Sequence, residues 1–381
     1  MASSRNRRLR SVSLVVVGGA VVAACGSPDS REAVPDPSDD VVSQDGASGD
    51  DEFEAQRSQT DALFIDIGDD QPGCSAAVRH SGGVTAFQYG LADVQAGDPI
   101  TVDTIFDIAS VSKQMTAGVI AAQAIDGVID LDEPVSSYFD GLPAGSESAT
   151  ISDLVHHTSG LPDYTELLDA EIDEITDADD AIDAVRAVPE NNFEPGADFE
   201  YSNTNYVLMA ELAASSADTS FVELSNEYIF APLQMTSTVV RDDQGDPLDG
   251  QAIGYEETDS GDFEIVSSSW RQTGDGAVHS TPTDVLRWAE VFIEPTTGDD
   301  VVGSPEWVEL MLQPGEVADD GTDYAFGLTV DDSMISHSGS WIGYGSYLVI
   351  HPDAGTAVAI SCNIDGFDAD SLGDALLDIW S

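Results

Sequence analysis

Basic residues are nearly absent from this chain of 381 residues, which has 12 Lys and Arg against 72 Asp and Glu and a formal net charge of −60. Nucleic acids and anionic membranes bind through basic surface, so the charge balance argues against both as partners. The acids run throughout the chain rather than forming one tail. This pattern predicts an acidic, halophilic protein, because high salt screens the repulsion between acids.

Lysine is the scarcest of the charged residues. Lys113 is the only lysine, and the other eleven basic residues are arginines. Arginine can replace a lysine that supplies only surface charge, but it cannot replace an amine that must give up its proton. Ser110 lies three residues earlier, where an extended lead-in meets a helical pattern, so both side chains are expected on one helix face. The alternative is a helix cap followed by a solvated amine.

The apolar stretch at the N-terminus is too short to span a bilayer. It covers residues 14–24, follows a basic segment that includes Arg7 and Arg8, and ends at Val22-Ala-Ala-Cys25. This pattern resembles a bacterial lipoprotein signal peptide. It predicts a signal peptide at residues 1–24, lipidation of Cys25 and a location on the outer side of the cell membrane. The alternative is a plain signal peptide with an incidental cysteine, and the Arg7-Arg8 pair also permits twin-arginine export.

Cysteine is scarce as well, with three in the chain. Beyond Cys25 only Cys74 and Cys362 remain, and an even pair outside the cytoplasm suggests a disulfide. The alternative is two buried thiols.

The rest of the chain divides by composition. Residues 25–51 are rich in Asp, Ser, Pro and Gly and predict a disordered tether, whereas residues 52–381 predict one α+β domain. Helical patterns and loops fill about 129–290. The predicted helices are 52–67, 111–126, 151–157, 178–188, 205–215, 221–229, 283–292 and 368–380. The predicted strands are 74–80, 84–90, 324–330, 334–337, 344–351 and 356–363. Strands at both ends with helices between them predict one sheet with a helical insertion.

Four short motifs follow one another along this domain. They are Ser110-x-x-Lys113, His156-His-Thr-Ser-Gly-Leu-Pro-Asp-Tyr164, Tyr201-Ser-Asn203 and His337-Ser-Gly339-Ser340. Together they resemble the serine β-lactamase and penicillin-binding-protein superfamily, in its class C β-lactamase, D-alanyl-D-alanine carboxypeptidase and esterase branch. The resemblance covers about residues 63–380. It implies an antiparallel sheet of five or more strands, flanked by N- and C-terminal helices and interrupted by the helical insertion.

The resemblance also implies the roles of the motif residues. Ser110 is the expected nucleophile, Lys113 the proton acceptor beside it, and Tyr201 a general base that then protonates the leaving group. Asn203 is expected to bind a substrate amide or the lysine. A tyrosine can serve as base only where cations favour its phenolate, and the cations expected here are Lys113 and a protonated His337.

The third motif is expected to bind substrate through His337, Gly339 and Ser340. Gly339 is expected to let substrate lie close to its strand. The oxyanion hole is expected at the backbone N–H groups of Ser110 and Ser340. The alternative for His337 is a surface histidine on a strand, and His157 is expected to be structural. The family's sheet places its first strand beside its last, which implies a Cys74–Cys362 disulfide.

These residues predict a hydrolase of an amide, lactam or ester carbonyl that works through an acyl-Ser110 intermediate, without metal or cofactor. Histidine replaces the lysine of many relatives in the third motif, which favours peptidase or esterase activity over efficient antibiotic hydrolysis. The alternatives are an esterase or D-amino-acid peptidase of the same fold and an inactive member that binds cell wall or ligand. The expected partner is a small-molecule or peptide substrate, with membrane contact through the lipid anchor only, and the expected state is a monomer. Loops at 167–188 and 242–268 are expected to form the pocket walls.

Overall fold

The computed structural model describes residues 45–168, 175–243, 247–296, 301–315, 317, 323–331 and 333–381. The predicted signal peptide, Cys25 and residues 25–44 of the predicted tether lie outside these described residues. Helix α1 (Asp45–Leu63) begins before the predicted end of the tether at residue 51, so that part of the prediction is wrong. Trp380 Nε1 donates to Thr60 Oγ1 in the last turn of α1, and each residue that extends an anchored helix gains one backbone hydrogen bond.

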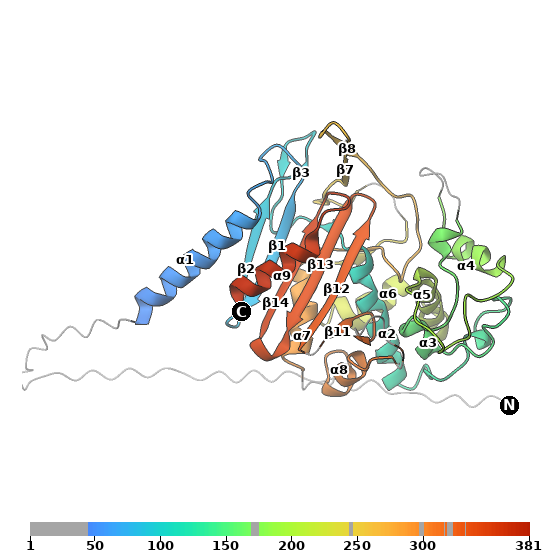
Figure 1. Ribbon diagram of the computed structural model, residues 1–381. Coiled ribbons are helices and arrows are strands. Elements are labelled where there is room, and N and C mark those ends of the chain that lie inside the picture. The colour runs from blue at the N-terminus through green and yellow to red at the C-terminus, as the bar shows by residue number, and fades with distance from the viewer. Residues whose placement is uncertain are drawn as a thin grey trace, which may run out of the picture. The chain divides into compact units, whose positions relative to one another are not determined.

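A seven-stranded antiparallel sheet lies at the centre of residues 50–381, with the strand order β10-β11-β12-β13-β14-β1-β2 (Figure 1). Its strands are β1 (Cys74–His80), β2 (Gly83–Tyr89), β10 (Asp323–Tyr324), β11 (Thr329–Asp331), β12 (Met334–Trp341), β13 (Tyr344–His351) and β14 (Thr356–Cys362). The predicted antiparallel sheet of five or more strands is therefore confirmed, and β12 runs further than predicted.

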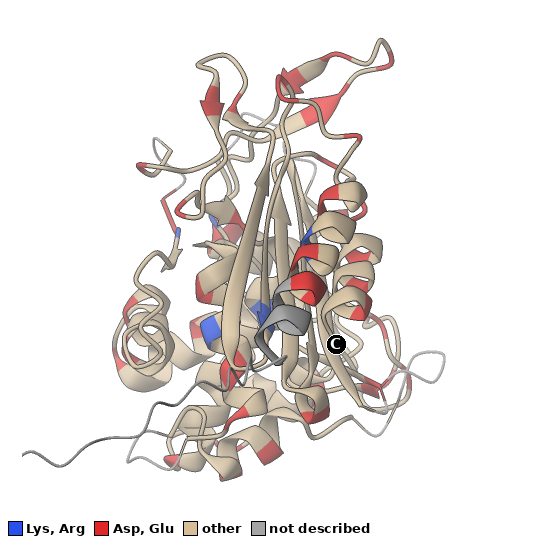
Figure 2. Cartoon of the chain, turned by 90° about the vertical axis from the view of Figure 1, so that its left-hand side faces the viewer, with Lys and Arg blue, Asp and Glu red and all other residues tan. Residues whose placement is uncertain are grey.

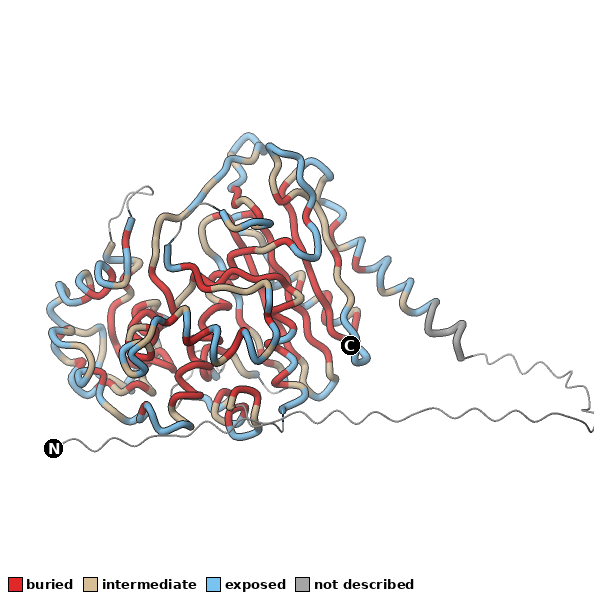
Figure 3. The backbone as a smooth tube through the Cα atoms, turned by 180° about the vertical axis from the view of Figure 1, so that it is seen from behind, coloured by how far each residue is buried: buried red, intermediate tan, exposed pale blue. Residues whose placement is uncertain are grey.

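Helices cover both faces of this sheet. Successive side chains of a strand point to opposite faces, and β14 shows the consequence. Val358 and Ile360 join the apolar cluster that contains Trp380 of α9 (Ala369–Trp380), whereas Ala357 and Ala359 join the cluster beneath α7 (Pro282–Ile293). The central strands are consequently buried along most of their length (Figure 3).

The helical insertion follows the prediction closely. The remaining helices are α2 (Lys113–Ile125), α3 (Ile151–Val155), α4 (Ala178–Arg186), α5 (Asn203–Ala217), α6 (Phe221–Ser225) and α8 (Pro305–Met311). The remaining strands are β3 (Leu91–Asp93), β4 (Asp98–Pro99), β5 (Phe106–Asp107), β6 (Val239–Val240), β7 (Tyr255–Glu257), β8 (Phe263–Ile265) and β9 (Val278–Ser280). The predicted helices from 111 onwards are confirmed, and α8 has no predicted counterpart. No helix among the described residues has both the length and the apolar composition of a membrane span.

Part of the acid excess stabilises helix starts. Asp153, Asp180 and Glu223 each complete a capping box at the start of α3, α4 and α6. A carboxylate there accepts a free backbone N–H and interacts favourably with the positive end of the helix dipole. Figure 2 shows acids on helices and loops around the molecule, while the long central strands carry almost none.

A disulfide closes the two neighbouring strands β1 and β14. The register pairs Cys74 directly with Cys362, and their sulfur atoms are 2.10 Å apart. Both cysteines are fully buried within the cluster beneath α9. The bridge thus joins the first and last strands of the domain, as the family resemblance implied.

Candidate active site

Ser110 lies in a short 3-10 helix, Ala109–Ser112, that leads directly into α2. The turn before it is strained, because Ala109 has a φ of +46°. Asp107 at the end of β5 stabilises this turn, since its Oδ1 accepts the Ala109 N–H at 2.8 Å. The N–H of Ser110 donates to no other group among the described residues. The local fold therefore presents the Ser110 hydroxyl beside a free amide donor.

Lys113 lies one turn later and is fully buried. Its Nζ donates to Ser110 Oγ at 3.0 Å, to Asn203 Oδ1 at 2.8 Å and to the Asp275 carbonyl oxygen at 2.7 Å. An ammonium has three donors, so all of them are used. All three acceptors are neutral oxygens, so the amine can lose a proton without breaking a direct ion pair. The sequence-predicted contact between Ser110 and Lys113 is present.

Asn203, the first residue of α5, has a fixed orientation. Its Nδ2 and its backbone N–H donate to Asp163 Oδ2 at 2.8 Å and 3.0 Å, which turns Oδ1 toward Lys113. Of the two predicted partners, the amide therefore contacts the lysine. Asp163, which the sequence analysis placed only within a motif, positions this amide.

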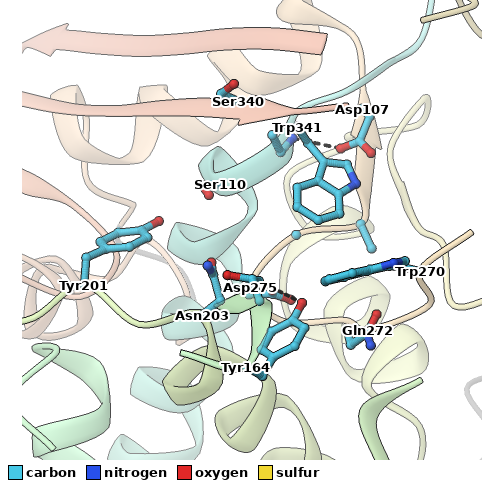
Figure 4. Close-up of a pocket in the computed structure, with 14 residues that line it drawn as sticks. Asp107, Ser110, Tyr164, Tyr201, Asn203, Trp270, Gln272, Asp275, Ser340 and Trp341 are labelled. Carbon is cyan, nitrogen blue, oxygen red and sulfur yellow. Dashed lines mark hydrogen bonds between the residues drawn. The ribbon is translucent and has the colours of Figure 1, made fainter. Parts of the chain in front are cut away.

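Tyr201 lies at the mouth of the cavity and is 37% exposed. Lys113 Nζ lies 4.9 Å from the centre of its ring, and the ring also packs against His157 at 4.4 Å. Figure 4 shows its hydroxyl directed toward the side of the cavity that holds Ser110. Among the described residues the hydroxyl has no hydrogen-bond partner, so it is free to meet a substrate.

His337 differs from its predicted role as a cation and substrate contact. It is buried beside Tyr201, with ring centres 6.2 Å apart, and does not line the cavity. Its Nδ1–H donates to the Ser338 carbonyl at 2.6 Å, which leaves Nε2 to accept from the Tyr324 hydroxyl at 3.0 Å. Burial, followed by the charge of Lys113, lowers the pKa of His337 to about 4. A neutral imidazole therefore replaces the expected imidazolium, so His337 supplies no positive charge beside Tyr201.

Glycine is needed at position 339 for a different reason from the expected one. A Cβ on it would lie 2.4 Å from Ser346 Oγ, 2.5 Å from the Ile108 carbonyl oxygen and 3.1 Å from Ser110 N. The missing side chain thus lets β12 pack against the turn that carries Ser110, rather than making room for substrate. This approach brings the next residue, Ser340, to the cavity wall.

The edge of β12 is open where it passes the site. Strand β11 pairs with β12 only from Met334 to Ser336, and no described strand continues that pairing toward Ser340. An open edge offers backbone groups to an extended substrate. The predicted oxyanion donors, the N–H groups of Ser110 and Ser340, belong to backbones that lie against each other at Gly339.

The cavity in front of Ser110 has a volume of about 240 Å³. Ser110, Tyr201, Asn203 and Ser340 line it, together with residues that the sequence analysis did not predict as site residues (Figure 4). The latter include Asp107, Tyr164, Trp270, Asp275 and Trp341. Trp270 and Trp341 lie at the end of the cavity away from Tyr201.

Asp275 is the most consequential of these residues. The turn that carries it lies against α2 and α5: Thr116 Oγ1 donates to the Gly274 carbonyl at 2.7 Å, and a Cβ on Gly274 would lie 2.2 Å from the Tyr206 carbonyl oxygen. The Asp275 carboxylate accepts from the Tyr164 hydroxyl at 2.8 Å, and burial raises the pKa of Asp275 to about 6. The glycines on both sides of it were the available signal, because they indicate close backbone packing.

His157 has the structural role that was expected. Its Nδ1 accepts the Ser202 N–H at 3.1 Å, and its ring packs against Tyr201 and Tyr206. Burial lowers the pKa of His157 well below its usual value. It therefore supports the Tyr201 segment as a neutral ring.

Two curated relatives resemble this chain in sequence. Penicillin-binding protein 4* of Bacillus subtilis (strain 168) is 26% identical over 320 residues, which cover 78% of this chain and 70% of that protein. A D-aminopeptidase of Brucella anthropi is 27% identical over 281 residues, which cover 71% of this chain and 52% of that protein. The chain therefore matches about half the length of this D-aminopeptidase.

Two solved structures share the fold. The octameric penicillin-binding protein homologue from Pyrococcus abyssi has a TM-score of 0.74 at 25% identity, covering 85% of this chain and 75% of that one. The D-amino acid amidase from Ochrobactrum anthropi SV3, complexed with L-phenylalanine amide, has a TM-score of 0.69 at 26% identity, covering 86% and 96%. Among family models, the one described as Beta-lactamase matches residues 60–379. That match includes the sheet, the helical insertion and all four motifs, and the chain therefore belongs to the Beta-lactamase family.

Proposed function

We propose that the protein is an exported serine hydrolase that acts on an amide, lactam or ester carbonyl through an acyl-Ser110 intermediate. The observation that carries this proposal is the 3.0 Å hydrogen bond between Lys113 Nζ and Ser110 Oγ at the wall of a substrate-sized cavity. A serine hydroxyl is a weak nucleophile at neutral pH unless a neighbouring base takes its proton. The names of the relatives, a D-aminopeptidase and a D-amino acid amidase, support amide chemistry.

The proposed acylation begins with Lys113 as the free amine. Its Nζ takes the hydroxyl proton while Ser110 Oγ attacks the carbonyl carbon, and the N–H groups of Ser110 and Ser340 stabilise the oxyanion. The tetrahedral intermediate then collapses. The bond to the leaving group breaks, and the proton passes from Lys113 through the Tyr201 hydroxyl to the leaving atom. Proton transfers of this kind typically accelerate a reaction by about 10²- to 10⁴-fold.

Deacylation repeats these steps with water. The Tyr201 hydroxyl, which is open to the cavity and whose ring centre lies 4.9 Å from Lys113 Nζ, takes a proton from the attacking water while its own proton passes to the free amine of Lys113. Collapse of the second tetrahedral intermediate releases the acid and returns a proton to Ser110 Oγ. His337 takes part only as a neutral, buried support for Tyr201 and Tyr324.

A chromogenic substrate panel tests this proposal. It contains a cephalosporin, a p-nitrophenyl ester and a D-Ala-D-Ala peptide, each given to wild type and Ser110→Ala in molar salt. Wild type should hydrolyse at least one of these substrates, and Ser110→Ala should not hydrolyse it. Failure to turn over any of them, with a folded protein that still binds one, would favour the inactive binding alternative.

Salt is part of the proposal, because the sequence has 72 acids and a single lysine. In 1 M salt the Debye length falls to about 3 Å, which screens most of the repulsion between these acids and most of their field at the active site. Activity is therefore expected to rise from dilute buffer to molar salt. Equal rates at both salt concentrations, with the fold intact, would remove this part of the proposal.

We also propose that Cys25 is lipidated, so that the domain is held on the outer side of the cell membrane as a monomer. The sequence of residues 1–25 supports the anchor, and the buried Cys74–Cys362 disulfide fits an oxidising compartment. Cys25→Ala should move the protein from the membrane fraction to the soluble fraction. Light scattering should give the mass of one chain, and an octamer, as named for the Pyrococcus abyssi homologue, would contradict the monomer.

A further inference from the structure

The carboxylates of Asp107 and Asp275 line the cavity in front of Ser110. No cationic side chain among the described residues lines it with them. Asp107 is 6% exposed, and its Oδ1 is used by the Ala109 N–H. Its Oδ2 accepts no hydrogen bond among the described residues, and the nearest ring nitrogen, His279 Nε2, is 3.9 Å away. Asp107 lines both this cavity and the neighbouring pocket that contains His279 and Arg241, so its Oδ2 can accept a donor from solvent or from a ligand.

Asp275 provides the second carboxylate. Its Oδ2 accepts from the Tyr164 hydroxyl, the backbone of Asp275 itself also bonds to the carboxyl group, and no other described residue donates to Oδ1. Burial raises the pKa of Asp275 to about 6, although the charge of Lys113 and the Tyr164 hydroxyl act in the opposite direction and Asp163 adds repulsion. The carboxyl group is therefore mainly ionised above pH 7.

No lysine, arginine or histidine lines this cavity in the described part of the chain. Lys113 lies behind Ser110, and its three donors are already used by neutral oxygens. His337, at the position where many relatives have lysine, is buried and neutral. A carboxylate-bearing substrate would meet repulsion here without a compensating cation.

Aromatic rings form the remaining walls. Trp270 packs against Trp341 with ring centres 5.4 Å apart and against Tyr164 at 5.8 Å (Figure 4). Ring faces attract cations, and their apolar surface binds the hydrocarbon part of a substrate. Carboxylates and aromatic rings together are the composition of an ammonium-binding site.

We propose that this cavity selects substrates with a free ammonium group near the scissile carbonyl, with Asp275 as the main determinant and Asp107 as the second. Unblocked amino-acid amides and esters form such a class. The ammonium would meet Asp275 Oδ1 and Asp107 Oδ2, while the side chain of the substrate would pack against Trp270 and Trp341. This inference rests on the proposed hydrolase function and adds the substrate class.

The decisive comparison needs only the wild-type enzyme. Phenylalanine p-nitroanilide, as each enantiomer, is compared with 3-phenylpropionyl p-nitroanilide, which lacks only the amino group. At pH 7 Asp275 is mainly ionised, and the α-amino group of the substrate is more fully protonated than at pH 8. At this pH and fixed salt, kcat/KM for the better enantiomer should be at least about tenfold higher than for the desamino compound, mainly through KM. An equal or lower value for both enantiomers would overturn the inference.

Variants locate the effect. Asp275→Asn keeps an acceptor for Tyr164, and Asp107→Asn keeps one for the Ala109 N–H. The ratio of kcat/KM between the amino and desamino substrates should fall about tenfold in Asp275→Asn and less in Asp107→Asn. Asp103→Asn is the matched control: it removes one negative charge from an exposed position that does not line the cavity, and its ratio should equal that of wild type. An unchanged ratio in both cavity variants, or an equal fall in the control, would contradict the assignment.

A p-nitrophenyl acetate assay separates the two proposals. If this small neutral ester is hydrolysed in a Ser110-dependent way while the amino group confers no advantage, the ammonium subsite is wrong and the hydrolase proposal stands. If neither this ester, nor either anilide, nor any substrate of the panel described above is hydrolysed, the hydrolase proposal fails, and this inference fails with it. If Asp275→Asn does not fold, as judged by circular dichroism, Asp107→Asn and the wild-type comparison still decide.

Discussion

The two sides of Ser110 differ in how their polar groups are satisfied. Behind it, Lys113 donates to three oxygens, and Asp163 fixes the amide that accepts one of those bonds. In front of it, Asp107 and Asp275 each keep one carboxylate oxygen that accepts no hydrogen bond from another described residue. The three donors of Lys113 behind Ser110 are all paired within the protein, whereas the front offers carboxylate oxygens to a donor that enters the cavity.

This difference separates the chemistry from the choice of substrate. A closed rear network positions the proton acceptor and makes no contact that depends on which carbonyl reacts. The open front carries the charges that a substrate must match. Changes behind Ser110 should therefore lower the rate for every substrate, and changes in front should alter the preference among substrates.

Replacing Lys113 should have the largest effect. Lys113→Met removes the proton acceptor, and kcat/KM should fall about 10³-fold for every substrate. The kcat/KM of Lys113→Arg should fall similarly, because arginine keeps the charge but cannot give up a proton at neutral pH. Steady-state kinetics of both variants tests this. Substantial activity in Lys113→Arg would show that charge alone is needed.

Removal of the Tyr201 hydroxyl should have the next largest effect. Tyr201→Phe keeps the ring that packs against His157 but loses the group that carries protons, so kcat should fall about 10²-fold. Tyr138→Phe is the matched control, since its hydroxyl bonds to Glu133 outside the cavity. Similar losses in the two variants would exclude a specific role for Tyr201.

A methyl group on Gly339 should disturb both sides at once. Gly339→Ala forces β12 away from the Ile108 carbonyl and the Ser110 turn, which should cost about 1–3 kcal/mol of stability and about tenfold in kcat. Gly83→Ala, whose Cβ would meet nothing closer than 3.9 Å, is the control. Urea denaturation and kinetics of both variants test this. An unaffected Gly339→Ala would show that β12 can shift at no cost.

Acid should destabilise the fold through His337, and protonation of Asp275 should at the same time reduce the preference for ammonium substrates. The folded-state pKa of His337 is lowered to about 4 from 6.5, so its stabilising contribution is present above pH 6.5 and is lost as pH falls toward 4. Between pH 7 and 4.5 this loss amounts to about 2 kcal/mol. Asp275 acts in the opposite sense, because its folded-state pKa is raised to about 6 and stability increases as that carboxyl is protonated.

His337→Gln separates the contribution of His337 to the pH dependence of stability from the opposing contribution of Asp275. The variant lacks the imidazole titration, whereas Asp275 is present in both proteins. Melting temperatures between pH 7 and 4.5 should therefore fall less in His337→Gln than in wild type. Equal falls would mean that His337 is not held neutral in the folded state.

Sequence patterns predicted the fold and the rear of the site better than the front. The helical and strand periodicities gave most elements, because they record which side chains are buried. The sole lysine indicated the Ser110–Lys113 contact, because arginine could not replace an amine that must give up its proton. The predicted disordered tether was extended too far, to residue 51, because an anchored helix continues beyond its apolar residues.

The front of the site depends on contacts between distant segments. Asp107, Asp275 and Trp270 are separated along the chain, and only the packing of β5, β9 and the turn at Gly274 brings them to one cavity. The neutral state of His337 likewise depends on its burial against Tyr324, which a motif cannot show. A motif fixes residue identity, whereas charge state follows from the surroundings in three dimensions.

The most direct test of the central claim is intact-mass measurement of the protein after reaction with a fluorophosphonate. The account predicts one adduct on wild type, located at Ser110 by peptide mapping, and none on Ser110→Ala. An adduct that forms equally on Ser110→Ala, or undiminished hydrolysis by that variant, would contradict the acyl-Ser110 mechanism.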